Sequence, residues 1–187
     1  DLLRQVKSAE EIAGLEESAY ILDQCFSRLL EIARPGITER ALQIELEAGF
    51  LRAGATGTGY GSIVGSGPNA AVLHFDPSQR ALQQGEFVLV DAGARVGRYV
   101  CDVTRTYVVG AAPTPFQRDL LRLVLEVEET ASARCRPGAE WKDLHLQAAV
   151  QITAGLINLG LMRGRAEDLV EREAHTLFFP HGLGHLV

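Results

Sequence analysis

Two aspartates lie on neighbouring arms of a predicted β-hairpin between residues 87 and 109. The first arm, 87–92, is an apolar run that includes Asp91 and is typical of a buried strand. A turn at 94–98 leads to the second arm, 99–109, which is rich in Val, Thr and Tyr and contains Asp102. A carboxylate inside a strand is unfavourable unless it is paired or binds a metal. The fold therefore has to provide a partner for both aspartates.

The pair alone leaves two interpretations open. Each aspartate could be half-exposed, cap a turn or pair with an arginine of the hairpin, namely Arg95, Arg98 or Arg105. Alternatively, the two carboxylates could bind a metal together. Because side chains alternate along a strand, Asp102 is expected to share a face with Val100, Thr104 and Thr106.

Composition excludes several classes of protein. The 187 residues are enough for one sizeable core, so one domain is expected. A formal net charge of −6 argues against nucleic-acid binding through a basic surface. The three cysteines are scattered without a CxxC spacing, which indicates a reducing, cytoplasmic compartment. No apolar run has the length of a membrane span, the acidic start is unlike a signal peptide, and both ends are expected to be truncated.

Two helices are predicted before the hairpin. A capping box at Ser8 begins a long helix that ends before Pro35, and Thr38 caps a second helix that reaches about Ala53. Residues at three-and-four spacing predict the buried side of the first helix: Ile12, Leu15, Ala19, Leu22, Phe26 and Leu29.

The segment between these helices and the hairpin is dense in glycine. Residues 54–69 lack the Gly-Lys-Ser/Thr of a phosphate loop, so strands and tight turns are expected there. A short strand is predicted at 71–75, which contains His74. By position alone His74 is interpreted as a structural histidine.

The order of elements then repeats. A helix capped at Thr114 runs to about Arg134, and another runs from Glu140 to about Leu159. Arg-Pro-Gly separates the helices in both pairs, at 34–36 and 136–138. We expect a duplicated unit of two helices and a small antiparallel sheet, with a first repeat at about 8–110 and the start of a second at about 113–187.

Two further histidines lie near the end of the chain, at His181 and His185. Gly182 and Gly184 make a helical zinc motif unsuitable, because glycine disfavours the helix. In a loop, one imidazole could bind a metal while the other reaches a bound molecule. Two Asp and one His would suit Mn, Co, Zn or Fe(II). The two could also be unrelated loop histidines, or form a minor zinc site with His175.

The chain resembles the catalytic domain of the pita-bread metallopeptidases, in their Xaa-Pro aminopeptidase and prolidase branch. The resemblance covers essentially the whole chain, 1–187. It implies an α+β, duplicated pita-bread fold: a curved antiparallel sheet backed by helices, with the second half incomplete here. The matching motifs are Ser62-Ile63-Val64-Gly65, Leu73-His74-Phe75, Asp91-Ala92-Gly93, Asp102-Val103-Thr104-Arg105-Thr106 and His181-Gly182-Leu183-Gly184-His185.

The resemblance also implies a role for each matched residue. Asp91 would bind one divalent metal ion, Asp102 would bridge two, and His185 would complete the coordination of the second. His74 and His181 would contact the substrate as catalytic residues. Mn²⁺ is the favoured metal, with Co²⁺, Zn²⁺ and Fe²⁺ as alternatives. Such ions would activate a bridging water and polarise the peptide carbonyl before proline.

The resemblance favours an Xaa-Pro aminopeptidase acting on proline-containing peptides, without nucleic-acid or membrane partners and as a homodimer at full length. Family members carry two further glutamate ligands and another histidine downstream. The 187 residues are therefore not expected to hold two metal ions by themselves. An Xaa-Pro dipeptidase (prolidase) is one alternative, and a catalytically inactive protein-binding module of this fold is another.

Overall fold

The computed structural model describes residues 2–186, so Asp1 and Val187 of the predicted 1–187 domain lie outside the described residues. The chain divides into two compact units, the first comprising 2–112 with Leu186 and the second comprising 113–185. Helices accompany antiparallel sheets, as the predicted α+β class requires. The duplication of the two units remains a prediction.

The first unit contains helices, a 3-10 helix and short strands. Its helical elements are α1 (Leu2–Gln5), α2 (Ala9–Ile32), α3 (Glu39–Arg52) and the 3-10 helix η1 (Gly67–Ala71). Its strands are β1 (Gly57–Thr58), β2 (Ile63–Ser66), β3 (Phe87–Ala92), β4 (Ala94–Val96), β5 (Tyr99–Val100) and β6 (Val103–Val108). The strands and turns predicted for 54–69 are therefore confirmed, with η1 beginning inside that segment.

Two three-stranded antiparallel sheets follow from these strands, in the orders β2-β3-β6 and β1-β4-β5. In the first sheet Asp91 lies opposite Ile63 on one side and Thr104 on the other. Strand β3 alternates between buried and half-buried residues, with Val88 and Val90 buried and Asp91 half-buried. The period of two therefore places Asp91 on the sheet face opposite the apolar core.

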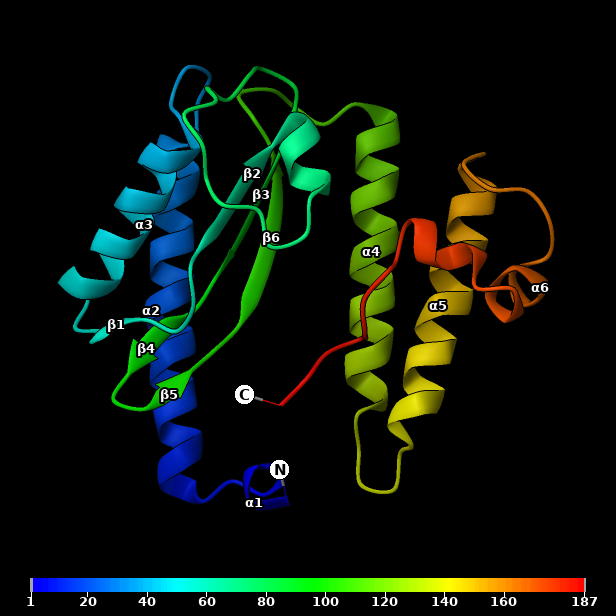
Figure 1. The fold of residues 1–187 in the computed structure, drawn as a ribbon, viewed down its shortest axis with the longest axis horizontal. Helices are drawn as coiled ribbons and strands as arrows, with labels where there is room; N and C mark the ends of the chain where they lie inside the picture. Colours follow the sequence, from blue (N-terminus) through cyan, green and yellow to red (C-terminus); the bar gives the residue numbers. More distant parts are fainter. Residues whose placement is uncertain (1, 187) are drawn as a thin grey trace. The chain divides into compact units, whose positions relative to one another are not determined.

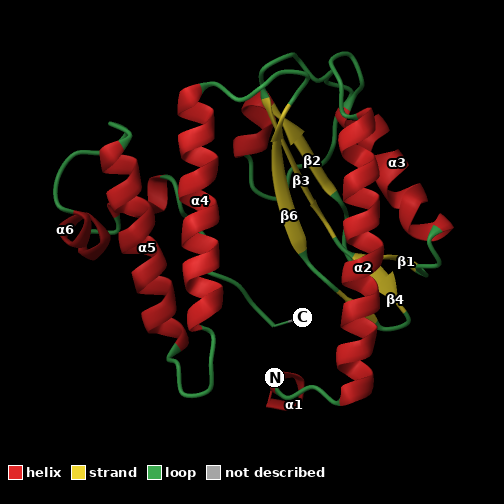
Figure 2. Cartoon of the chain, turned by 180° about the vertical axis from the view of Figure 1, so that it is seen from behind, coloured by secondary structure: helices red, strands yellow, loops and turns green. Residues whose placement is uncertain are grey.

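Helices α2 and α3 cover the core face of the sheets (Figures 1 and 2). The predicted capping box at Ser8 and the predicted cap at Thr38 are both confirmed. The predicted buried side of α2 is wrong at Ile12 and Ala19, which are exposed. The side chains of α2 that are buried extend from the middle of the helix toward its end: Ser18, Ile21, Leu22, Cys25, Phe26 and Leu29.

The second arm of the predicted hairpin is not one continuous strand. It is interrupted between β5 and β6 at Cys101 and Asp102, and Asp102 itself lies outside both strands. The Cys101 amide donates a hydrogen bond to the Ser18 hydroxyl at 2.8 Å instead of continuing a strand pairing. The strand-face prediction that grouped Asp102 with Val100 is therefore wrong, because alternation does not continue through an interruption.

The strand predicted at 71–75 is also wrong. Residue 71 ends η1, and Leu73 and His74 form an exposed turn. Pro68 stands in the first turn of η1, where its fixed φ suits a helical turn. The backbone at His74 then enters the left-handed region with φ of 52°, which a strand does not allow.

The second unit consists of helices: α4 (Pro115–Arg134), α5 (Trp141–Asn158), α6 (Ala166–Glu171) and the 3-10 helix η2 (Ala174–Leu177). The capping box at Thr114 and the predicted extents of α4 and α5 are confirmed. Gly155 of α5 allows close contact with α4, because a Cβ there would lie 2.1 Å from a methyl group of Leu123. Figure 1 shows α4 and α5 side by side.

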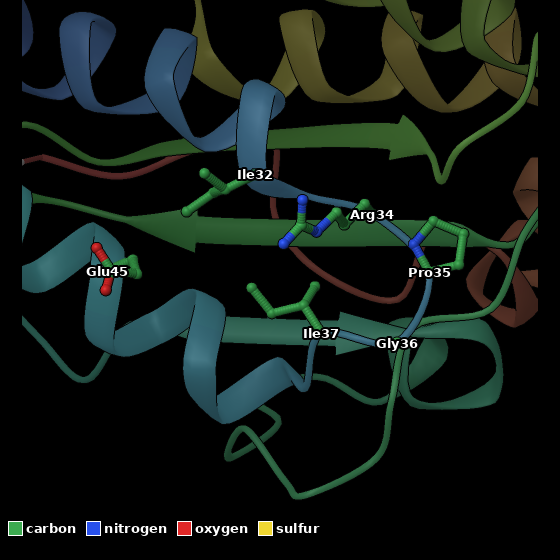
Figure 3. Close-up of a pocket in the computed structure, with 6 residues that line it drawn as sticks. All are labelled: Ile32, Arg34, Pro35, Gly36, Ile37 and Glu45. Atoms are coloured by element: carbon green, nitrogen blue, oxygen red, sulfur yellow. The ribbon is translucent and has the colours of Figure 1, made fainter.

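None of the helices in the part of the chain that the structure describes could cross a membrane, given their length and polarity. An open groove of about 540 Å³ lies between the end of α2 and α3 (Figure 3). Its lining includes none of the predicted site residues and consists of Ile32, Arg34, Pro35, Gly36, Ile37 and Glu45.

Candidate metal centre

The two aspartates meet at one hydroxyl group. The Tyr60 hydroxyl lies 2.6 Å from Oδ1 of Asp91 and 2.9 Å from Oδ1 of Asp102. Asp91 comes from the end of β3, and Asp102 comes from the interruption just before β6. The interruption thus brings the second carboxylate to the same phenol group as the first.

Glycines on both sides of this contact allow the segments to approach. A Cβ at position 93 would lie 2.1 Å from the Cys101 carbonyl oxygen and 3.0 Å from the ring of Tyr60. A Cβ at position 59 would lie 2.1 Å from a methyl group of Val100. Because no real Cβ fits at 2.1 Å, the close approach of the Cys101 backbone requires glycine at position 93, and glycine at position 59 leaves room for the Val100 side chain.

A buried hydroxyl on α2 holds the interruption in place. The Ser18 hydroxyl donates to the Ala94 carbonyl at 2.6 Å and accepts from the Cys101 amide at 2.8 Å. Ser18 is 0% exposed, so water cannot replace its hydroxyl as the hydrogen-bond partner of these two backbone groups. Ser18 therefore joins the backbone after Asp91 to the backbone before Asp102.

The electrostatics favour a cation at this position. Burial, together with hydrogen bonds and charges from Asp91 and Asp102, raises the pKa of Tyr60 far above its ordinary value, so the phenol stays protonated. Its single proton is shared by two negative groups that repel each other. Asp91 is half-buried and Asp102 is exposed. The alternative interpretation, in which each aspartate is simply half-exposed, accounts for this exposure. It does not explain why both carboxylates contact the same Tyr60 hydroxyl.

The carboxylate pair fits divalent cations, because hard cations prefer oxygen ligands of this kind. Closely placed acidic groups are stabilised when a positive charge lies between them. Among residues 2–186, no group of three or more His, Cys, Asp or Glu side chains is arranged to hold a metal ion. Asp91 and Asp102 are thus the two predicted metal ligands whose carboxylates contact a common hydroxyl group.

The three predicted histidines lie on other segments. His74 is on the exposed turn after η1 in the first unit. His181 and His185 lie in the irregular last segment of the second unit, so the prediction that they do not form a helix is confirmed. His175, the suggested third member of a minor zinc site, is buried in η2.

His181 is oriented by two local contacts. Its Nδ1 lies 2.8 Å from the Gly182 carbonyl oxygen, and its ring meets the ring of Phe179 edge to face at 4.9 Å between centroids. Since a carbonyl oxygen only accepts, Nδ1 carries the proton and Nε2 of the neutral ring is an acceptor. Phe179 also lies against His145, at 5.4 Å.

The sequence prediction missed two residues of this site, Tyr60 and Ser18. Tyr60 is the one aromatic residue in the glycine-dense stretch 54–69 and has glycine on both sides, which is a signal for a ring in a crowded place. Ser18 lies among apolar residues on the buried side of α2, and a polar residue there needs a buried partner. Neither signal identifies the partner.

A comparison with known families gives the context for this geometry. The model of metallopeptidase family M24 matches residues 13–187. The chain belongs to this family. The Xaa-Pro aminopeptidase of Escherichia coli (strain K12) is 37% identical over 183 residues, and the match covers 98% of this chain and 42% of that protein. The Xaa-Pro aminopeptidase of Haemophilus influenzae is 32% identical and is covered to 43%. This member of family M24 thus spans less than half the length of these relatives.

Solved structures agree with the family assignment. Aminopeptidase PepP of Pseudomonas aeruginosa matches with a TM-score of 0.94 at 37% identity, covering 98% of this chain and 41% of that one. Zinc-substituted aminopeptidase P of E. coli in complex with product matches equally well, with 42% of its chain covered. The predicted pita-bread fold, present here in part, is confirmed, and divalent metal ions are indicated for the family.

Proposed function

We propose that this chain is part of an Xaa-Pro aminopeptidase and that Asp91 and Asp102 form the acidic part of its metal centre. The observation that carries the proposal is the convergence of both carboxylates on the Tyr60 hydroxyl. Xaa-Pro aminopeptidases among the relatives support the substrate class, and the zinc-substituted neighbour supports a divalent cation.

In the full-length protein Asp91, Asp102 and His185 would contribute ligands to a site for divalent ions, with Mn²⁺ favoured, and residues outside this chain would complete that site. When bound, such ions lower the pKa of a shared water and polarise the carbonyl of the scissile bond. The Tyr60 hydroxyl contacts both carboxylates, and this contact keeps them oriented toward the same point.

His181 and His74 would face the peptide. The contact from Nδ1 of His181 to the Gly182 carbonyl leaves Nε2 available for a substrate proton or hydrogen-bond donor. The peptide bond before proline lacks an N–H, and the ring fixes φ. Recognition of such a bond therefore depends on shape and on contacts to the carbonyl, which an imidazole can supply.

The cysteines support a reducing compartment, and we place the protein in the cytoplasm. Cys25, Cys101 and Cys135 are all free thiols, and the first two are buried. The family resemblance suggests a homodimer for the full-length protein. Sedimentation of the full-length protein would test the dimer.

The test is peptide hydrolysis by the full-length protein after metal removal and after addition of Mn²⁺. Cleavage of Xaa-Pro-Xaa tripeptides that is restored by Mn²⁺ and lost again in Asp102→Ala would support the proposal. Asp119→Ala, on an exposed position of α4, is the matched control and should keep the activity.

Two other outcomes would contradict the proposal. Cleavage restricted to Xaa-Pro dipeptides would indicate a prolidase instead of an aminopeptidase. A folded full-length protein that cleaves no Xaa-Pro peptide with Mn²⁺, Co²⁺, Zn²⁺ or Fe²⁺ would indicate a protein-binding module.

A further inference from the structure

A buried carboxylate lies beneath the segment that carries His74. Glu39 is the first residue of α3 and is 0% exposed. Glu39 is not part of the candidate metal centre. Polar groups contact both of its carboxylate oxygens. A fully buried carboxylate with this many donors needs a structural or functional reason.

The two oxygens of Glu39 hold the two ends of one chain segment. Oε1 accepts from the amide and the hydroxyl of Ser66, both at 2.8 Å. Oε2 accepts from the amide of Ser78 at 3.1 Å and from its hydroxyl at 2.6 Å. The Asn69 side-chain amide contacts both oxygens, at 3.0 and 3.2 Å. The segment between these ends, 67–77, contains η1 and His74.

The charge of Glu39 is stabilised by hydrogen-bond donors, and Arg80 supports one of these donors. The Arg80 guanidinium donates to the Ser66 hydroxyl at 2.7 Å and forms an ion pair with Glu86 at 2.7 Å. Burial opposes the charged form of Glu39, but the hydrogen bonds from Ser78, Ser66 and Asn69 outweigh it and lower the pKa of this carboxyl. Glu39 is therefore an anion at neutral pH, and an anion binds these donors more strongly than a neutral group would.

Between the two ends, the part of the segment around His74 is exposed. Val72, Leu73 and His74 are exposed, and His74 adopts a left-handed backbone that costs free energy for a residue other than glycine. Such a conformation persists only where the surrounding structure holds it. Four contacts of Glu39 act at the two ends of the segment, at Ser66 and Ser78, and two more act at Asn69 within it.

We propose that Glu39 is a positioning residue that clamps the 67–77 segment at both ends and thereby sets the location of His74. One part of this proposal rests on the function proposed above, namely that the clamp affects substrate contact through His74. The clamp itself is a property of the first unit and involves neither Asp91 nor Asp102.

Glu39→Gln in the full-length protein tests the clamp with the smallest change in shape. One oxygen becomes an NH₂ group, which faces a serine amide that can only donate. We expect faster hydrogen exchange at the backbone amides of 66–78, apart from Pro68 and Pro77, which carry no amide hydrogen, with unchanged Mn²⁺ affinity. Glu45→Gln, on an exposed position of the same helix, should leave exchange unchanged.

A double-mutant cycle with His74→Ala then separates positioning from stability. For Xaa-Pro-Xaa cleavage, Glu39→Gln should lower kcat/KM by on the order of 10- to 100-fold. In the His74→Ala background it should lower kcat/KM by less than about twofold, because the clamp acts through His74. An equal loss in both backgrounds, or unchanged exchange over 66–78, would overturn the proposal.

Two further outcomes are distinguishable. If Glu39→Gln does not fold, Ser78→Ala removes one hydroxyl donor and leaves the carboxylate in place, so faster exchange at 67–77 is still expected and its absence would count against the clamp. If the parent protein cleaves no Xaa-Pro peptide, the proposed function fails. The exchange data then decide the clamp alone, and its role in substrate contact is rejected.

Discussion

Gly93 lies directly against Cys101, so that a Cβ at position 93 would be 2.1 Å from the Cys101 carbonyl oxygen. Gly93 follows Asp91 by two residues, and Cys101 immediately precedes Asp102. The close approach of these two backbone segments is therefore what brings the carboxylates to one hydroxyl group. The glycine of the Asp-Ala-Gly motif is therefore explained by the lack of space for a side chain, without reference to catalysis.

Gly93→Ala should disturb the metal centre. The obstacle is a backbone carbonyl, which cannot rotate away as a flexible side chain could, so overpacking should lower the free energy of unfolding by roughly 1–3 kcal/mol. Denaturant titration of the full-length protein would measure this loss. Gly61→Ala is the control, because a Cβ there meets nothing within 4 Å. Equal stability of the two variants would contradict the steric explanation.

Tyr60→Phe should weaken metal binding without unfolding the protein. The ring still fills its place, but both carboxylates lose the donor that orients them. Removal of such an outer contact lowers metal affinity by on the order of 10- to 100-fold. Calorimetric titration with Mn²⁺ would measure it, with exposed Tyr20→Phe as the control. Unchanged Mn²⁺ affinity would show that the hydroxyl does not orient the pair.

Ser18→Ala should destabilise the first unit. The Ala94 carbonyl and the Cys101 amide would lose their partner in a buried place. Each unsatisfied buried group costs about 1–3 kcal/mol, so for two groups we expect a loss of roughly 2–6 kcal/mol in the free energy of unfolding. Ser27→Ala, on an exposed position of α2, should change stability by less than about 0.5 kcal/mol. A similar loss in both variants would argue against a special role for Ser18.

The contribution of Glu39 to stability should depend on pH. Its folded pKa lies below the ordinary value of 4.5, so its contribution is fully present above about pH 4.5 and is lost as pH falls through the folded pKa. Unfolding experiments on wild type and Glu39→Gln should give a constant difference at neutral pH that shrinks in acid. If the difference in unfolding free energy between wild type and Glu39→Gln grows as pH falls, the folded pKa of Glu39 is raised and not lowered, which would contradict this prediction.

Local elements were predicted well because their signals are local. The capping boxes at Ser8 and Thr114, the β3 strand and the ends of α3 and α5 all follow from residues within a few positions of one another. Ala71–Phe75 was predicted wrongly for the same reason. An apolar run resembles a strand, but the turn there belongs to a segment whose two ends contact Glu39, which is distant in sequence.

The sequence by itself determined the four long helices α2 to α5, strand β3 and the two carboxylates with their motif neighbours. Only the tertiary structure decided that the second arm breaks at Asp102 and that Tyr60 joins the pair. The contacts responsible connect Tyr60 with Asp91, Ser18 with Cys101 and Glu39 with Ser78, which are separated by 31, 83 and 39 residues. Packing buries these donors and acceptors away from water, so each needs a partner within the protein. That partner lies far along the chain, and local sequence patterns do not identify it.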